Sequence, residues 1–238
     1  PFIERVTQGQ GEIDAGLTDT LGGVLMRGAW VDLKRLLADE RARLEAAGVL
    51  FTEAFDPAEV QPGPEGVVWR TVQARGVVYC DGYKSAQRGP FAYLPWQPAK
   101  GEAVSLRSNA PQKPFILNRE GWALPLGEGL WRTGTNWARE GLDEQPTESQ
   151  KEKLIRRFRS YFGQEVSVEV TAHVAGVRPC TSDNLPFLGT HPTEPSTHLF
   201  NGLGPRGTVW APTLAEEMAE YLVSGKPFRP DCDLRRFG

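Results

Sequence analysis

The chain has 238 residues, enough for one large domain or two interleaved ones with a buried apolar core. Lys and Arg number 27 against 30 Asp and Glu, and this net charge of −3 gives no reason to expect nucleic acid or an anionic membrane as a partner. No apolar run reaches the length of about 18 residues that a membrane span needs, and the first residues have no signal-peptide pattern, so the default expectation is a cytoplasmic protein. The 3 cysteines and 3 histidines lack ligand spacing, so neither a disulfide framework nor a metal site is predicted.

The first half of the chain alternates between helix and strand signals. Residues 32–48 place four leucines on one helical face, with Asp32 as a possible N-cap and Gly48 as the stop. GVVWRTV (66–72) and GVVYC (76–80) are apolar and β-branched, which predicts two strands.

The second half begins with a different pattern. Between residues 101 and 137, short extended runs separated by turn residues predict an antiparallel meander. A helix is predicted from Thr147, where T-E-S-Q forms a capping box, to Gly163, and a long strand over 166–177. The last helix should run from about Thr208 or Pro212 to Val223. The predicted fold is mixed α/β (α+β), with a largely antiparallel sheet covered by helices on one side.

The hexapeptide GLGPRG (202–207) reads as G-x-G-x-x-G but stands too near the end of the sequence to open a dinucleotide-binding βαβ unit. What remains is a strand, a glycine turn and a helix N-terminus, which is a local site for anionic or electron-rich ligand atoms. The alternative is that this turn only packs on the sheet and binds no ligand. Arg206 within the turn either reaches a ligand or projects to solvent.

Arg178 lies in the densest group of candidate residues, GVRPCTSDNLPFLGTHP (176–192). It follows an apolar strand and precedes a proline, so its guanidinium should be held near a strand end, where a planar fork suits a substrate carboxylate. The alternative is a structural salt bridge to an acid such as Asp183. Asp183 and Asn184 themselves suggest an Asx turn before a buried apolar corner.

The 7 tryptophans include Trp96, Trp122, Trp131 and Trp137 in or beside the meander, where they either line an apolar pocket or belong to the core. The sequence offers no nucleophilic triad, and no catalytic side chain is predicted.

Taken together, these segments resemble the D-amino-acid oxidase superfamily of FAD-dependent oxidoreductases, which includes glycine oxidase and sarcosine oxidase. The segments that match in order are residues 28–49, 77–85, 98–106, 122–137, 175–192 and 198–222. The spacing of G-L-G-P-R-G-x-x-x-A-P is similar to that in the oxidase half of the bifunctional enzyme that completes 5-methylaminomethyl-2-thiouridine in tRNA.

The resemblance implies hydride transfer from the carbon beside an amine to flavin N5, so that the protein orients the substrate and excludes water. It makes Arg178 the partner of the substrate carboxylate and Trp122 a second substrate-binding residue. The implied cofactor is FAD, and the implied cofactor-binding residues are Gly82, Gly202, Leu203, Gly204, Arg206, Gly207 and Thr208.

The resemblance also implies a division into two units. Residues 1–27 and 91–175 would form a substrate-type domain, and residues 28–90 and 176–238 part of an FAD-binding domain. The matched portion is about the last two-thirds of a family member, so the sequence is expected to be a fragment that lacks the N-terminal dinucleotide fingerprint.

The predicted function is FAD-dependent oxidation of an amine or amino acid, with a small molecule as partner and neither nucleic acid nor a membrane. One alternative is a cofactor-free module of the same fold that binds a small carboxylate. Another is a tRNA-modifying oxidase, which the absence of a basic excess disfavours. No oligomeric state is predicted.

Overall fold

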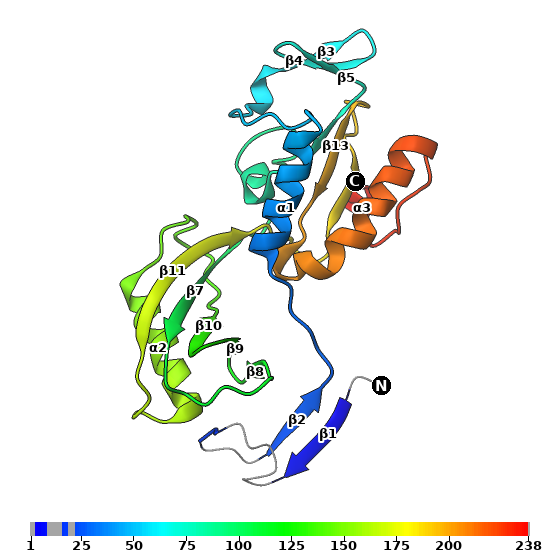
Figure 1. The fold of residues 1–238 in the computed structure, drawn as a ribbon. Helices are drawn as coiled ribbons and strands as arrows, with labels where there is room; N and C mark the ends of the chain where they lie inside the picture. Colours follow the sequence, from blue (N-terminus) through cyan, green and yellow to red (C-terminus); the bar gives the residue numbers. More distant parts are fainter. Residues whose placement is uncertain (1–2, 9–15, 19–21, 238) are drawn as a thin grey trace.

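The computed structural model describes residues 3–8, 16–18 and 22–237 (Figure 1). Its largest sheet is five-stranded and antiparallel, with the strand order β11-β7-β10-β9-β8. The strands are β7 (Ala99–Arg107), β8 (Leu117–Asn118), β9 (Trp122–Gly127), β10 (Leu130–Gly134) and β11 (Glu169–Arg178). The meander and the long strand predicted from sequence are therefore confirmed, as is the mixed α/β class.

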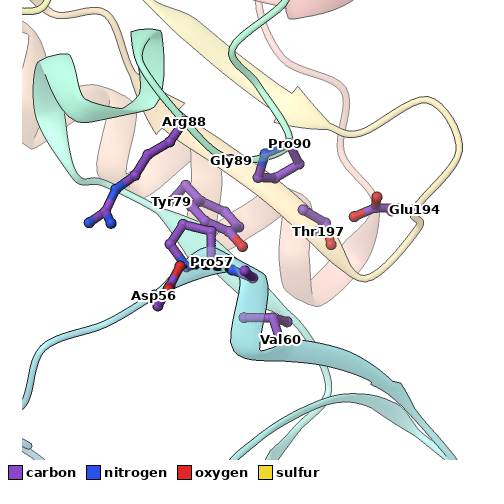
Figure 2. Close-up of a pocket in the computed structure, with 10 residues that line it drawn as sticks. Asp56, Pro57, Val60, Tyr79, Arg88, Gly89, Pro90, Glu194 and Thr197 are labelled. Carbon is purple, nitrogen blue, oxygen red and sulfur yellow. Dashed lines mark hydrogen bonds between the residues drawn. The ribbon is translucent and has the colours of Figure 1, made fainter.

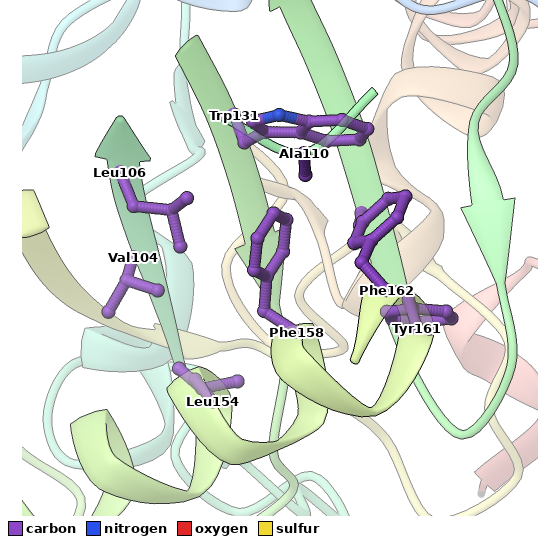
Figure 3. Packing of buried hydrophobic residues seen from close by; sticks show 9 residues of the cluster. Val104, Leu106, Ala110, Trp131, Leu154, Phe158, Tyr161 and Phe162 are labelled. Carbon is purple, nitrogen blue, oxygen red and sulfur yellow. The ribbon is translucent and has the colours of Figure 1, made fainter. Parts of the chain in front are cut away.

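Helix α2 (Glu148–Phe162) covers one face of this sheet. Its buried face consists of Leu154, Phe158, Tyr161 and Phe162, which pack on Val104, Leu106, Ala110 and Trp131 of the sheet side (Figure 3). Along β7 the burial alternates, so that Glu102, Val104 and Leu106 face α2 while Gly101, Ala103 and Ser105 face away. The face away from α2 carries no helix in Figure 1.

The start of α2 corrects the predicted capping box. Thr147 is the N-cap, but its side chain makes no capping hydrogen bond. Its N–H and hydroxyl instead donate to the buried carboxylate of Glu102, over 2.8 and 3.0 Å. Glu102 Oε2 also lies 2.9 Å from His173 Nε2 of β11. A carboxylate on β7, the strand next to the edge strand β11, therefore holds the beginning of the helix.

A smaller, three-stranded sheet has the order β12-β13-β6, and β13 runs parallel to β6. Its strands are β6 (Val77–Tyr79), β12 (Phe187–Thr190) and β13 (Thr197–Asn201). Helix α3 (Gly207–Ser224) packs on one side through Leu214 and Met218. It begins one residue before the earlier of the two predicted starts, and Pro212 lies inside it.

The remaining elements are short or peripheral. The predicted strand 66–72 is a hairpin instead, because Arg70 turns the chain with a φ of 53°. The short and peripheral elements, which include the two strands of this hairpin, are β1 (Ile3–Gln8), β2 (Gly22–Met26), α1 (Leu33–Ala46), η1 (Pro57–Glu59), β3 (Val60–Gly63), β4 (Gly66–Trp69), β5 (Val72–Ala74), η2 (Gly82–Ala86), η3 (Gly204–Arg206) and η4 (Leu234–Phe237).

Helix α1 has the predicted N-cap, since the Asp32 side chain accepts a hydrogen bond from the Arg35 N–H. Its leucine face, however, packs against little of the described chain. None of its residues is buried, and Leu37 is 64% exposed. The pattern of apolar residues predicts the helix correctly but does not say what covers it. None of the described helices is long and apolar enough to cross a bilayer.

The C-terminal segment is fastened to the small sheet. The Leu188 N–H donates to the Cys232 carbonyl over 2.8 Å, and Arg236 Nε donates to Asp183 Oδ2 over 2.8 Å. Asp183 also accepts from the Leu185 N–H, which is the predicted Asx turn. Burial raises the pKa of Asp183, but the hydrogen bonds from Arg236 and Leu185 outweigh it, so that this pKa lies below its usual value.

We expect Phe158→Ala to lower the free energy of unfolding by about 3–5 kcal/mol, because it leaves a cavity between α2 and the sheet. Leu37→Ala on α1 is the matched control and should change this free energy by less than about 0.5 kcal/mol. Urea denaturation of both variants tests the difference. Equal losses would contradict the packing described.

A second prediction concerns Asp183→Asn. Because the folded-state pKa of Asp183 lies below its unfolded value, its ionised form stabilises the fold above about pH 4, and this contribution disappears as the pH falls through the folded pKa. The variant should therefore be less stable than the parent chain at pH 7, and the difference should shrink toward pH 3. A difference independent of pH would rule out the charge interaction with Arg236.

Candidate functional site

Arg178 ends β11 on the face of the large sheet that points away from α2. Its Nη2 donates to Thr135 Oγ1 over 2.8 Å, and its Cζ lies 5.0 Å from the centre of the Trp137 ring. The guanidinium crosses Gly101 of the neighbouring strand so closely that a Cβ on Gly101 would lie 2.0 Å from Nη2. Arg178 can therefore take this position only because residue 101 is a glycine, which has no side chain.

Among the residues that the structure describes, no carboxylate forms an ion pair with Arg178. The acid considered in the sequence alternative, Asp183, is paired with Arg236 instead. Burial lowers the pKa of the Arg178 guanidinium, which still remains cationic at neutral pH. A half-buried, unpaired guanidinium has donors left for an incoming anion.

The turn after β13 lies directly beside Arg178 in the fold. The Gly204 N–H donates to the carbonyl of Pro179 over 3.2 Å, and Pro179 is the next residue after Arg178. Gly202 and Gly204 have φ values of 75° and 55°, in the left-handed region that favours glycine. At Gly202 a side chain would also lie 2.8 Å from the Thr181 methyl group. The glycines of GLGPRG thus meet a backbone requirement.

A buried asparagine connects this turn with Gly82, another of the implied cofactor-binding residues. Asn201 Oδ1 accepts from the Gly202 N–H over 2.8 Å, and Asn201 Nδ2 donates to the Gly82 carbonyl over 2.9 Å and to Ser85 Oγ over 3.0 Å. Sequence reasoning missed Asn201. Its place between a predicted strand and a glycine-rich turn was the only local signal.

Helix α3 opens next to this turn with its first N–H groups uncapped by a side chain. Thr208 is exposed, and Val209 is 73% exposed. Because the helix dipole is positive at this end, the helix start favours a negatively charged or electron-rich group. The Arg206 Nη2 donates to the Asn184 carbonyl over 2.8 Å, and the Arg206 side chain lies over the Trp210 ring.

The four tryptophans in or beside the meander do not form one group, because some belong to the core and others lie near Arg178. Trp131 is buried under α2, and Trp96 packs against the core beneath the small sheet. Trp137 is exposed beside Arg178, while Trp122 lies against Gly134, a Cβ on which would approach the indole to 2.8 Å. Gly134 directly precedes Thr135, which accepts the hydrogen bond from Arg178. Trp122 and Arg178 therefore border the same open face of the sheet.

The structure thus brings the predicted residues together in one region. Arg178, the turn 202–207, the start of α3 and Gly82 are connected through Pro179 and Asn201. The residues that hold Arg178, Thr135 and Gly101, had no signal in the sequence. Among the described residues, no group of three or more His, Cys, Asp or Glu side chains is placed to bind a metal ion.

Comparison with known proteins gives consistent matches. The chain is 28% identical to the glycine oxidase of Pseudomonas aeruginosa over 135 residues, which cover 56% of this chain and 37% of that protein. It is 26% identical to the bifunctional protein of tRNA 5-methylaminomethyl-2-thiouridine biosynthesis from Burkholderia pseudomallei over 228 residues, covering 85% of this chain and 33% of the relative. The chain therefore spans about a third of the length of these curated relatives.

Solved structures show the same fold at low sequence identity. Glycine oxidase from Geobacillus kaustophilus superposes with a TM-score of 0.75 at 23% identity, covering 90% of this chain and 60% of that one. Iminodiacetate oxidase from Chelativorans sp. BNC1 superposes with a TM-score of 0.76 at 20% identity, covering 94% and 64%. Residues 3–221 match the DAO family, described as FAD dependent oxidoreductase. Since this match includes most of its residues, the chain belongs to the DAO family of FAD-dependent oxidoreductases.

Proposed function

We propose that this chain forms the substrate-facing part of an enzyme that oxidises a small amine or amino acid bearing a carboxylate. The observation that carries the proposal is the half-buried guanidinium of Arg178, which no carboxylate of the described chain neutralises. A bidentate salt bridge to a substrate carboxylate would supply the missing charge. The relatives named glycine oxidase and iminodiacetate oxidase are consistent with such a substrate.

The residues near Arg178 have separate tasks in this proposal. Thr135 and the Trp137 ring hold the guanidinium in place, and the Asn136 carbonyl accepts a long hydrogen bond of 3.5 Å from Nη1, so that donors remain for a substrate carboxylate. Trp122 offers an apolar surface on the same side, which would exclude water from the substrate. The substrate would be oriented by its carboxylate, with its amine-bearing carbon toward the turn 202–207.

The region around the start of α3 fits the ring end of FAD. The uncapped N–H groups of Gly207 and Thr208 suit the electron-rich N1–C2=O edge of an isoalloxazine, and Gly202 to Arg206 would line its approach. When bound, FAD accepts a hydride from the carbon beside the amine. Gly82, held next to this turn by Asn201, would be a further contact.

The two larger sheets would belong to two units with different tasks. Residues 1–27 and 91–175 would form the substrate-type unit, and residues 28–90 and 176–238 the part that contacts FAD. Residues 1, 2, 9–15 and 19–21 of the first unit lie outside the described residues. The proposed boundary at 175/176 falls within β11, which carries Arg178 from the large sheet toward the turn after β13.

Titration of the purified chain with FAD, followed by anaerobic addition of glycine, tests the function. Bound flavin whose absorbance bleaches with glycine supports the oxidoreductase. A chain whose melting temperature rises with glycine but not with FAD would instead support a carboxylate-binding module without cofactor chemistry.

Replacing the guanidinium tests the role of Arg178. Arg178→Ala should lower kcat/KM for glycine about 30-fold or more, chiefly through KM, because a charged hydrogen-bonding partner worth about 2 kcal/mol is lost. Oxidation of methylamine, which has no carboxylate, should change far less. Arg156→Ala, on the exposed surface of α2, is the control. Equal losses on glycine and methylamine would remove the carboxylate contact from the proposal.

Gly101 allows a complementary test without removing any charge. In Gly101→Ala the new methyl group would occupy the position of the guanidinium, so we expect the same selective loss on glycine while Arg178 stays in the sequence. Gly176→Ala is a matched control, because Gly176 pairs with Gly101 across β7 and β11 and a Cβ there has no atom within 4 Å. If both variants behave like the parent chain, the placement of Arg178 is wrong.

A further inference from the structure

A separate cavity of about 340 Å³ lies beneath the three-stranded β3-β4-β5 sheet, beside the beginning of β13 (Figure 2). It is lined by Asp56, Pro57, Ala58, Val60, Tyr79, Arg88, Gly89, Pro90, Glu194 and Thr197. Thr197 is the first residue of β13, whereas the turn beside Arg178 follows its last residue. At about 3.3 Å per residue, the two regions lie at opposite ends of this strand.

Two largely buried side chains, Tyr79 and Thr197, face this cavity, and their hydroxyl oxygens open into it. Tyr79 is 5% exposed and Thr197 is 4% exposed. Neither hydroxyl has a hydrogen-bond partner among the residues that the structure describes, and Figure 2 shows both turned toward the space above Val60. Because both hydroxyl groups open into the cavity and are free of protein partners in the described chain, one polar ligand in the cavity can bond to both.

The charged side chains around the cavity indicate the charge of its ligand. The Glu194 carboxylate lies beside Thr197, and no hydrogen bond or ion pair joins it to another described side chain (Figure 2). Burial, followed by the negative charges of Glu194 and Asp81, raises the pKa of Tyr79 to about 12. Both of these neighbouring charges are negative, which favours a cationic ligand. Arg88 points its guanidinium to the other side of the Tyr79 ring, away from Thr197.

The remaining walls are apolar. Pro57, Val60 and Pro90 surround the hydroxyl groups. A neighbouring cavity of about 430 Å³ shares Val60, Glu194 and Thr197 and continues along β3 and β4. An occupant with one cationic, hydrogen-bonding end and a short apolar body would match both features. Two hydroxyl groups and a carboxyl group suit the three N–H donors of a primary ammonium group.

We propose that this cavity is a binding site for a small primary alkylammonium compound, whose ammonium group donates to Tyr79, Thr197 and Glu194 and whose alkyl chain lies against Pro57, Val60 and Pro90. The site stands apart from the proposed oxidation site and does not depend on it. The two sites also differ in ligand class. Arg178 would bind the carboxylate of its ligand, whereas this cavity would bind an ammonium group.

The test is a titration of the full chain with propylammonium chloride, followed by NMR shifts of backbone amides. Saturable shifts should centre on Val60, Tyr79 and Thr197. Tetramethylammonium, which is cationic but has no N–H donor, and propionate should produce no saturable shifts there at equal ionic strength. Equal responses to all three salts would overturn the proposal, as would propylammonium shifts confined to other residues.

Isosteric variants separate the contacts from the fold. Tyr79→Phe, Thr197→Val and Glu194→Gln should each weaken propylammonium binding about tenfold, as expected for a lost hydrogen bond to a charged group. Thr171→Val, at an exposed position of β11 outside both cavities, is the control and should bind as the parent chain does.

Thermal unfolding of the same variants provides a second readout. Because the two hydroxyl groups have no partner in the described chain, Tyr79→Phe and Thr197→Val should leave the melting temperature unchanged or raise it. Weakened binding with retained stability supports the site. Unchanged binding in Tyr79→Phe would overturn it.

Discussion

The absence of a side chain at Gly101 is the constraint on which the proposed site depends. It allows the Arg178 guanidinium to cross the neighbouring strand and meet Thr135 and the Trp137 ring, where a methyl group would occupy the same space. The charge is thereby held at the edge of the large sheet, half-buried and without a carboxylate partner in the described part of the chain. An unpaired, half-buried cation lowers the stability of the fold, and an anionic ligand that pairs with it offsets this cost.

The two faces of the large sheet serve different purposes. The face under α2 is closely packed around Trp131 and Phe158, and the buried carboxylate of Glu102 on this face is satisfied by Thr147 and lies beside His173. The opposite face bears small residues of β7, the Trp122 ring and Arg178. Packing of the first face makes the sheet rigid, and this rigidity gives the second face a fixed geometry for ligand recognition.

Sequence patterns predicted what is local and missed what joins distant segments. The start of α1 followed from Asp32 and the end of α2 from Gly163, because a capping side chain and a glycine with positive φ act within one turn. The capping box at Thr147 was wrong because Glu102, 45 residues away, binds that N-terminus. Arg178 was singled out correctly as a strand-end cation, but its support from Gly101 and Thr135 needed the sheet register. The likeness to the DAO family, confirmed by the comparisons, came from the order of several short segments.

The most direct test of the account is a crystal structure of the chain with FAD and glycolate, a carboxylate that lacks the amine. The account predicts a bidentate contact between the glycolate carboxylate and Arg178, with Thr135 and Trp137 unmoved and the flavin ring beside the first turn of α3. Glycolate bound elsewhere, or Arg178 paired with a carboxylate of the protein itself, would contradict it.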